Sequence, residues 1–293
     1  MTLKLASYNI QYGVGKDERF DLKRIVEELG DADIIALQEV EAGNPLRNLV
    51  DQPEEFARLL PHEHWVYGPG IDLYLSPSDT GGQSGVRHRF GNMILSRWPL
   101  LSVSVHMLPK VALRGTMHLQ RTLIEAVIDT PEAPVRVCCT HLEHVSPMTR
   151  MPQVETLRDI MLEAPRRGGP WGGVEASKPG FPAPEPAWPR EAILLGDMNF
   201  APDSREYTTL IGDHSPLTGQ RISRAQGLFD AWLLTGHAET EGRTFIRPGF
   251  PELRLDHCFV TPGLADAVKS MWIDEAATGS DHQPIFVTLD HLP

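Results

Sequence analysis

The chain has 293 residues, of which 41% are hydrophobic and 23% charged. This is the balance of an ordinary globular protein and excludes long disordered stretches. With 39 acidic and 27 basic side chains, the formal net charge is −12, and no long run of Lys and Arg offsets it. Duplex nucleic acid is therefore a disfavoured partner, because affinity for it comes mainly from basic side chains that neutralise phosphates.

The first part of the chain predicts two strands, each followed by a helix. Residues 3–10 and 33–38 are apolar runs of strand length, the second typical of a buried strand. Apolar residues at helical spacing, between a capping Asp21 and Gly30, predict a helix over residues 22–29. A second helix is expected over residues 54–60.

The middle of the chain predicts four strands, one helix and a long loop. The strands are expected at 93–96, 101–106, 121–128 and 135–140. The helix that follows carries its apolar positions at Val154, Leu157, Ile160 and Met161.

Residues 164–189 are crowded with Pro and Gly, which predicts a surface loop without regular structure. A strand resumes at 192–195, so we interpret the loop as an insertion within one domain spanning residues 1–293. Trp171, Phe181 and Trp188 in this loop could cap a substrate, but pinning the loop to the body is expected.

The C-terminal part predicts short helices near 204–211 and 229–234, with strands at 255–260, 268–273 and 285–289. Many strands and few helices, not in regular alternation, favour an α+β fold with two packed sheets.

Three cysteines, Cys138, Cys139 and Cys258, are too few for a disulfide framework and lie in apolar surroundings, which predicts buried free thiols. Residues 1–10 read as a strand rather than a signal peptide. No apolar run approaches the roughly 20 residues of a membrane span. We therefore expect a cytoplasmic protein.

Polar residues suited to metal and phosphate chemistry stand at the ends of six apolar strands. In chain order these are Asn9, Glu39, His141, Asp197 with Asn199, Asp256, and Asp281 with His282. One such residue alone is commonly a cap or turn former, and a lone histidine is commonly structural. Burying carboxylates is unfavourable unless they are paired or bind a cation, and their oxygens are the ligands that Mg²⁺ prefers. Six strand ends of this kind predict one shared cation site.

The order of these motifs along the chain resembles the endonuclease/exonuclease/phosphatase superfamily. This superfamily includes pancreatic-type deoxyribonucleases, apurinic endonucleases, neutral sphingomyelinases and inositol polyphosphate 5-phosphatases. The matching motifs are SYNI at 7–10, LQEV at 37–40, GNMILS at 91–96, THL at 140–142, GDMN at 196–199, RLDH at 254–257 and SDHQP at 280–284.

The resemblance implies a four-layer α/β/β/α sandwich of two mainly antiparallel sheets, with the site at one edge. It also implies that Mg²⁺ or Mn²⁺ is bound by Glu39, supported by Asn9 and Asp281. The remaining site residues would act on water and phosphate. Asp197 would orient or deprotonate the attacking water, Asn199 would hold that water or a phosphate oxygen, and His141 and the Asp256-paired His282 would contact the scissile phosphate. A carboxylate beside His282 would favour its imidazolium form.

Two departures argue against a DNA-repair enzyme. Gln11 stands where the apurinic endonucleases carry an acidic residue, and His141 stands where they carry tyrosine. Arg89, Arg114 and Arg121 could add phosphate contacts, although solvation is expected for the first two.

We expect a metal-dependent phosphoesterase that hydrolyses a phosphodiester or phosphomonoester, with a small or lipid-derived substrate favoured. The alternative is a nuclease acting on DNA or RNA. A non-catalytic binding protein is a lesser alternative, because such a protein would have little need for the whole residue set. Segments 71–90 and 164–189 are the expected specificity elements. One or two metal ions, and any oligomeric state, remain open.

Overall fold

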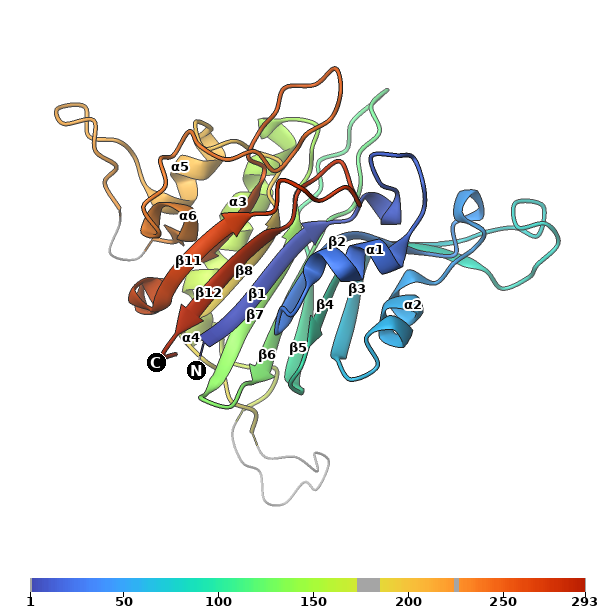
Figure 1. Cartoon of the computed structure of the whole chain (residues 1–293), viewed down its shortest axis with the longest axis horizontal. Helices are drawn as coiled ribbons and strands as arrows, with labels where there is room; N and C mark the ends of the chain where they lie inside the picture. Colours follow the sequence, from blue (N-terminus) through green and yellow to red (C-terminus); the bar gives the residue numbers. More distant parts are fainter. Residues whose placement is uncertain (1, 173–184, 224–226, 293) are drawn as a thin grey trace.

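The computed structural model describes residues 2–172, 185–223 and 227–292 (Figure 1). Two six-stranded sheets pack face to face. The first has the order β11 (Val268–Ile273), β12 (Ile285–Asp290), β1 (Thr2–Asn9), β2 (Ile34–Ala42), β4 (Arg87–Ser96) and β3 (His64–Tyr74). The second has the order β5 (Leu100–Met107), β6 (Thr122–Asp129), β7 (Pro134–His141), β8 (Ala192–Asp197), β10 (Asp256–Val260) and β9 (Phe229–Asp230).

Each sheet contains one parallel pair, β1 with β2 and β7 with β8, and its other pairs are antiparallel. The parallel pairs matter for the site because they end at the same edge of the sandwich. The inner strands β2, β6, β7 and β8 are buried along almost their whole length, which explains why they read as continuous apolar runs, whereas the edge strand β5 alternates between half-buried and exposed positions.

Helices cover the outer faces of both sheets. α1 (Leu22–Leu29) and α2 (Gln52–Leu59) lie on the first sheet, whereas α3 (Pro147–Leu162) and α5 (Arg205–Ile211) lie on the second. The central core lies between the sheets and includes Leu5, Ile94 and Val137. This arrangement is the predicted four-layer α/β/β/α sandwich, which the structure confirms.

Local chemistry explains where the helices begin. The side chain of Asp21 accepts hydrogen bonds from the N–H groups of Lys23 and Arg24, as expected for an N-cap. Ser204 caps α5 in the same way by accepting from Tyr207 N (3.1 Å). Two short helices follow: α4 (Ala164–Arg167) comes after α3, and α6 (Ala231–Leu234) comes after β9.

The three cysteines are free and buried, as predicted. Cys139 lies in the core between the sheets, and Cys138 faces the helices of the second sheet. Neighbouring residues of a strand point to opposite faces, so both thiols are shielded by different layers. Among the described residues, no helix combines the length and the apolar character that crossing a membrane requires.

Some expected boundaries were wrong. Segment 71–90 is not one loop, because β3 and β4 pair from Tyr74 and Arg87 inwards and leave residues 75–86 as the connection. The Pro/Gly-rich stretch begins with helix α4, since Pro165 lies in the first turn, where its missing N–H is tolerated. The helix expected near 229–234 begins as strand β9, and only residues 231–234 are helical.

Trp188 pins the Pro/Gly-rich segment to the body of the protein. Its Nε1 donates to Ala164 O (3.1 Å), and the guanidinium groups of Arg136 and Arg167 lie 5.8 and 5.5 Å from the centres of its rings. Phe181 and the rest of residues 173–184 lie outside the described residues.

Candidate active site

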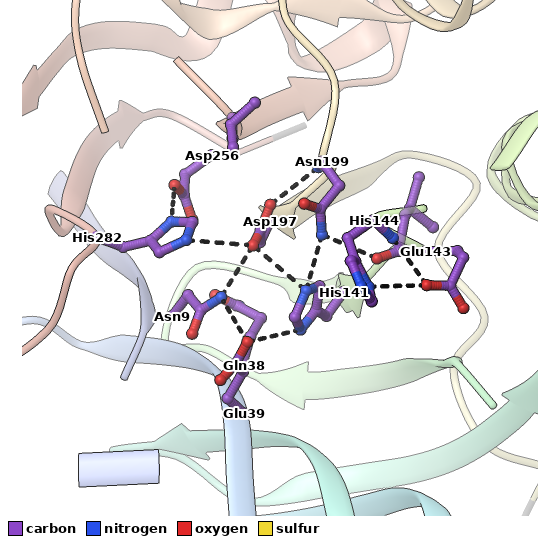
Figure 2. Close-up of polar contacts among 12 residues, drawn as sticks. Asn9, Gln38, Glu39, His141, Glu143, His144, Asp197, Asn199, Asp256 and His282 are labelled. Carbon is purple, nitrogen blue, oxygen red and sulfur yellow. Dashed lines mark hydrogen bonds and ion pairs between the residues drawn. The ribbon is translucent and has the colours of Figure 1, made fainter. Parts of the chain in front are cut away.

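The register of the parallel pairs brings the strand-end residues together (Figure 2). Asn9 ends β1 opposite Gln38 of β2, so Glu39 follows directly at the same edge. In the second sheet, His141 ends β7 opposite Asp197, which ends β8. Because both parallel pairs end at this edge, side chains from distant parts of the chain meet there.

Asp197 lies at the centre of the cluster. Its Oδ2 accepts from Asn9 Nδ2 (2.9 Å), and its Oδ1 accepts from the backbone N–H of Asn199 (2.9 Å). The Nε2 atoms of His141 and His282 lie 3.3 and 3.6 Å from Asp197 Oδ2. Burial, with the nearby charge of Asp256, raises the pKa of Asp197 to about 6.

The backbone at this edge adopts conformations that ordinary side chains rarely take. Gly196 has φ +146°, and a Cβ there would lie 1.9 Å from Thr140 O, so the close approach of β7 and β8 requires glycine. Glu39 and Asn199 have φ of 60° and 52°. Such strain in non-glycine residues is typical of functional sites that the surrounding fold holds in place.

His282 is paired with Asp256, with 2.7 Å between Nδ1 and Asp256 Oδ2. Thr244 Oγ1 holds the backbone of Asp256 by accepting a hydrogen bond from its N–H (3.0 Å). Burial alone lowers the pKa of His282, but the carboxylates of Asp256 and Asp197 outweigh it and raise the pKa to about 10. His282 is therefore an imidazolium at neutral pH.

His141, unlike His282, is neutral. Burial and the positive charge of Arg121 hold its pKa well below the usual range, so the ring is neutral. Asn199 Nδ2 donates to Leu142 O (3.0 Å) and lies 2.9 Å from His141 Nε2, which also faces Asp197 Oδ2. Nδ1 lies 3.9 Å from Glu39 Oε1.

The carboxylate of Glu39 makes few polar contacts with its neighbours. Its nearest polar contact is Asn9 Nδ2 at 3.4 Å from Oε1. Burial raises the pKa of Glu39 to about 7 against the opposing charges of Arg121 and His282, and the charges of Asp281 and Asp197 add to the rise. Asp281 lies at the edge of the cluster, where its carboxylate contacts Ser280 Oγ (3.5 Å) and Arg247 Nη1 (3.8 Å).

The donor set fits a divalent cation. Among the described residues, His141 Nδ1 and Asp256 Oδ1 are buried atoms without a hydrogen-bond partner. Asp197, Asp256 and His282 form a group whose ligand atoms lie within 4.8 Å of one another. Both nitrogens of His282 already face carboxylates, however, and an imidazolium cannot ligate a metal. Glu39 is the carboxylate that most needs a cation.

Arg121, which the sequence indicates only as one of three possible phosphate contacts, lies beside the site. It is 4% exposed, its Nη2 lies 3.3 Å from His144 Nδ1 and 3.9 Å from Glu143 Oε1, and its charge acts on Glu39, lowering the pKa of that carboxyl against the effect of burial. The feature of the sequence that points to Arg121 is its place as an isolated arginine at the start of an apolar strand. Arg89 instead pairs with Asp51 Oδ2 (2.7 Å).

The Endonuclease/Exonuclease/phosphatase family matches residues 6–282, and the chain belongs to this family. Members of the family are hydrolases that act on phosphoester bonds. No curated protein matches the sequence.

Solved structures of low sequence identity share the fold. An endonuclease/exonuclease/phosphatase from Beutenbergia cavernae is 21% identical with a TM-score of 0.64, over 98% of this chain and 71% of that one. The mannosyl-6-phosphatase of Bacteroides thetaiotaomicron is 20% identical (TM-score 0.60, 99% and 100% covered). A 3′-5′ exonuclease from Neisseria meningitidis is 20% identical (TM-score 0.56, 99% and 100% covered).

Proposed function

We propose that this chain is a single catalytic domain that hydrolyses a phosphodiester or phosphomonoester with the help of Mg²⁺ or Mn²⁺. The observation that carries the proposal is the shared carboxylate of Asp197. It is held by Asn9 and Asn199 and faces a neutral His141 on one side and a charged His282 on the other. This arrangement supplies a proton acceptor and two kinds of donor within one buried cluster.

Glu39 would hold the metal ion, with Asn9 and Asp281 in support. The ion would neutralise charge on the non-bridging phosphate oxygens. Glu39 suits this role because, among the described residues, no Lys or Arg contacts its carboxylate, and Asn9 Oδ1 has a second lone pair beyond the one that accepts from Gln11 N (3.1 Å).

Asp197 is the acceptor for the proton of the attacking water. Its pKa of about 6 leaves it ionised at neutral pH and close enough to that pH to exchange protons readily. The water oxygen bonds to phosphorus while the ester P–O bond breaks; the water's proton passes to Asp197, and the leaving oxygen takes a proton from solvent and departs as the alcohol. Asn199 keeps the Asp197 carboxylate in place through its backbone N–H and leaves its own Oδ1 for the water.

His282 and His141 are the phosphate donors. His282 offers a charged Nε2–H, kept ionised by Asp256, to the oxyanion that develops in the transition state. His141 offers a neutral donor at Nδ1, a buried atom without a hydrogen-bond partner among the described residues.

A small or lipid-derived phosphate ester is the favoured substrate class. The net charge of −12 disfavours a polyanion. A structure of the same fold is named a mannosyl-6-phosphatase, so sugar phosphates belong among the first substrates to test. The three buried free thiols support a cytoplasmic location, where thiols remain reduced.

The proposal is tested with bis-p-nitrophenyl phosphate, p-nitrophenyl phosphate and mannose 6-phosphate beside a plasmid-nicking assay. Each assay is run with Mg²⁺, Mn²⁺ or EDTA, and with the His282→Ala variant. We expect EDTA-sensitive, His282-dependent cleavage of a small ester without nicking. Nicking with the same dependences would show the alternative, a nuclease, and hydrolysis of no substrate would contradict the enzymatic proposal.

A further inference from the structure

Glu28 anchors the loop that leads into Asp281 and His282, which connects β11 to β12 and lies against the N-terminal part of the chain (Figure 1). Glu28 stands in the last turn of α1. Its Oε1 accepts from the backbone N–H groups of Thr278 (2.7 Å) and Gly279 (3.0 Å). Hydrogen bonds to an ionised acceptor are about twice as strong as neutral ones. Two consecutive amides just before the site are therefore held by one side chain.

Two further residues of the N-terminal segment hold the same loop. The hydroxyl of Tyr8 in strand β1 donates to Glu28 Oε2 (2.8 Å), which fixes the position of the carboxylate. Lys16 donates twice, from its backbone N–H to Thr278 O (2.9 Å) and from Nζ to Ala277 O (3.0 Å). Both N–H and C=O groups of the loop thus find partners in residues 8–28.

Gly279 and Ser280 connect the residues held by Glu28 to His282, and both are tightly packed. A Cβ at Gly279 would lie 2.5 Å from Glu28 Oε2 and 2.7 Å from Ile25 Cδ1, so the loop backbone lies directly on α1. The next residue, Ser280, is fully buried, and its hydroxyl accepts from His282 N (3.1 Å). A shift of Gly279 would therefore displace His282 as well.

We propose that Glu28 is a positioning residue that sets the place of Asp281 and His282 by holding the loop before them. This inference rests on the proposed function of those two residues. The hydrogen-bond partners of the Glu28 carboxylate are Tyr8, Thr278 and Gly279, so Glu28 acts on the site through the loop. Groups that orient metal ligands typically contribute about 10–100-fold to metal affinity or activity.

The test compares Glu28→Ala with Glu27→Ala, a matched control that removes the same charge from an exposed position in the same turn of α1. Two experiments are made: steady-state kinetics, giving kcat and KM for bis-p-nitrophenyl phosphate with Mg²⁺, and amide hydrogen exchange in residues 274–284. Glu28→Ala should exchange faster in this segment and lose about 10–100-fold in kcat, with a smaller change in KM. Glu27→Ala should match the wild type in both measurements.

Glu28→Gln separates positioning from charge and serves if Glu28→Ala fails to fold. Its carbonyl oxygen can accept from both backbone N–H groups, while its NH₂ group donates to the Tyr8 hydroxyl. We expect it to restore most of the rate and of the exchange protection. Unchanged loop exchange in Glu28→Ala, or faster exchange with wild-type kcat, would overturn the inference. If the wild-type protein cleaves no ester, the proposed function fails alone, and loop exchange still decides whether Glu28 holds the segment.

Discussion

Replacing Glu39 with glutamine should stabilise the metal-free protein at alkaline pH. The folded-state pKa of Glu39 is raised from its usual 4.5 to about 7, so the fold disfavours the ionised form. This penalty is absent below about pH 4.5 and fully developed above about pH 7. A shift of this size corresponds to about 3 kcal/mol at pH 8, and we expect a gain of about 1–3 kcal/mol because the buried amide also needs partners.

Thermal unfolding with EDTA measures this effect. At about 2 °C per kcal/mol, the midpoint of Glu39→Gln should lie about 2–6 °C above wild type at pH 8 and match it near pH 4.5. Added Mg²⁺ should reverse the order, because a ligand that binds only the folded state at 100 times its Kd adds about 2.7 kcal/mol, and only wild type retains the ligand carboxylate.

Glu41→Gln is the matched control, two residues along the same strand. The Glu41 carboxylate is buried, but Arg47, His88 and Asn44 contact it, and these partners hold its pKa below the usual value against the effect of burial. Its ionised form therefore stabilises the fold at neutral pH, and this contribution disappears as pH falls. Glu41→Gln should lower the midpoint at pH 8. A lower midpoint for Glu39→Gln as well, or an unchanged response to Mg²⁺, would refute the reasoning.

Three more outcomes are expected. Asp197→Asn should lose about 10²–10⁴-fold in kcat, the usual contribution of a general base, while the Mg²⁺-induced rise in unfolding midpoint persists; loss of that rise would place Asp197 among the metal ligands. Asp256→Asn should lower the pKa of His282 from about 10 and move the alkaline limb of the kcat/KM profile to lower pH, and an unmoved limb would contradict the pairing. Gly196→Ala should destabilise the fold strongly, because its Cβ would lie 1.9 Å from Thr140 O. Gly30→Ala meets no atom within 4 Å and should lose about 1–3 kcal/mol from its backbone conformation alone (φ 60°, ψ −127°), and equal midpoints for the two variants would contradict this account.

Local patterns in the sequence predict much of the fold. Apolar runs mark the strands, and Asp21 and Ser204 mark the starts of α1 and α5 because capping is a contact between near neighbours. Edge and irregular elements are harder to predict. β3 is an exposed edge strand whose apolar pattern is weak, and its existence depends on pairing with β4.

The candidate site shows the same division. The strand-end polar residues and their family motifs stand out in the sequence, and the structure brings seven of the eight into direct contact with one another, with Asp281 at the edge. Sequence reasoning also expected Asp256 to keep His282 charged, and the raised pKa agrees. A strand end is a local feature, which is why these positions were visible before their neighbours were known.

The tertiary structure decides how far burial and neighbouring charges shift the pKa of each side chain, and which residues hold it in place. His141 and His282 are the same residue type at similar strand ends, yet one is neutral beside Arg121 and the other is charged beside Asp256. The anchoring of the 277–280 loop by Glu28 joins residues about 250 positions apart. Desolvation and Coulomb interactions depend on distance in space, and neither is readable from position along the chain.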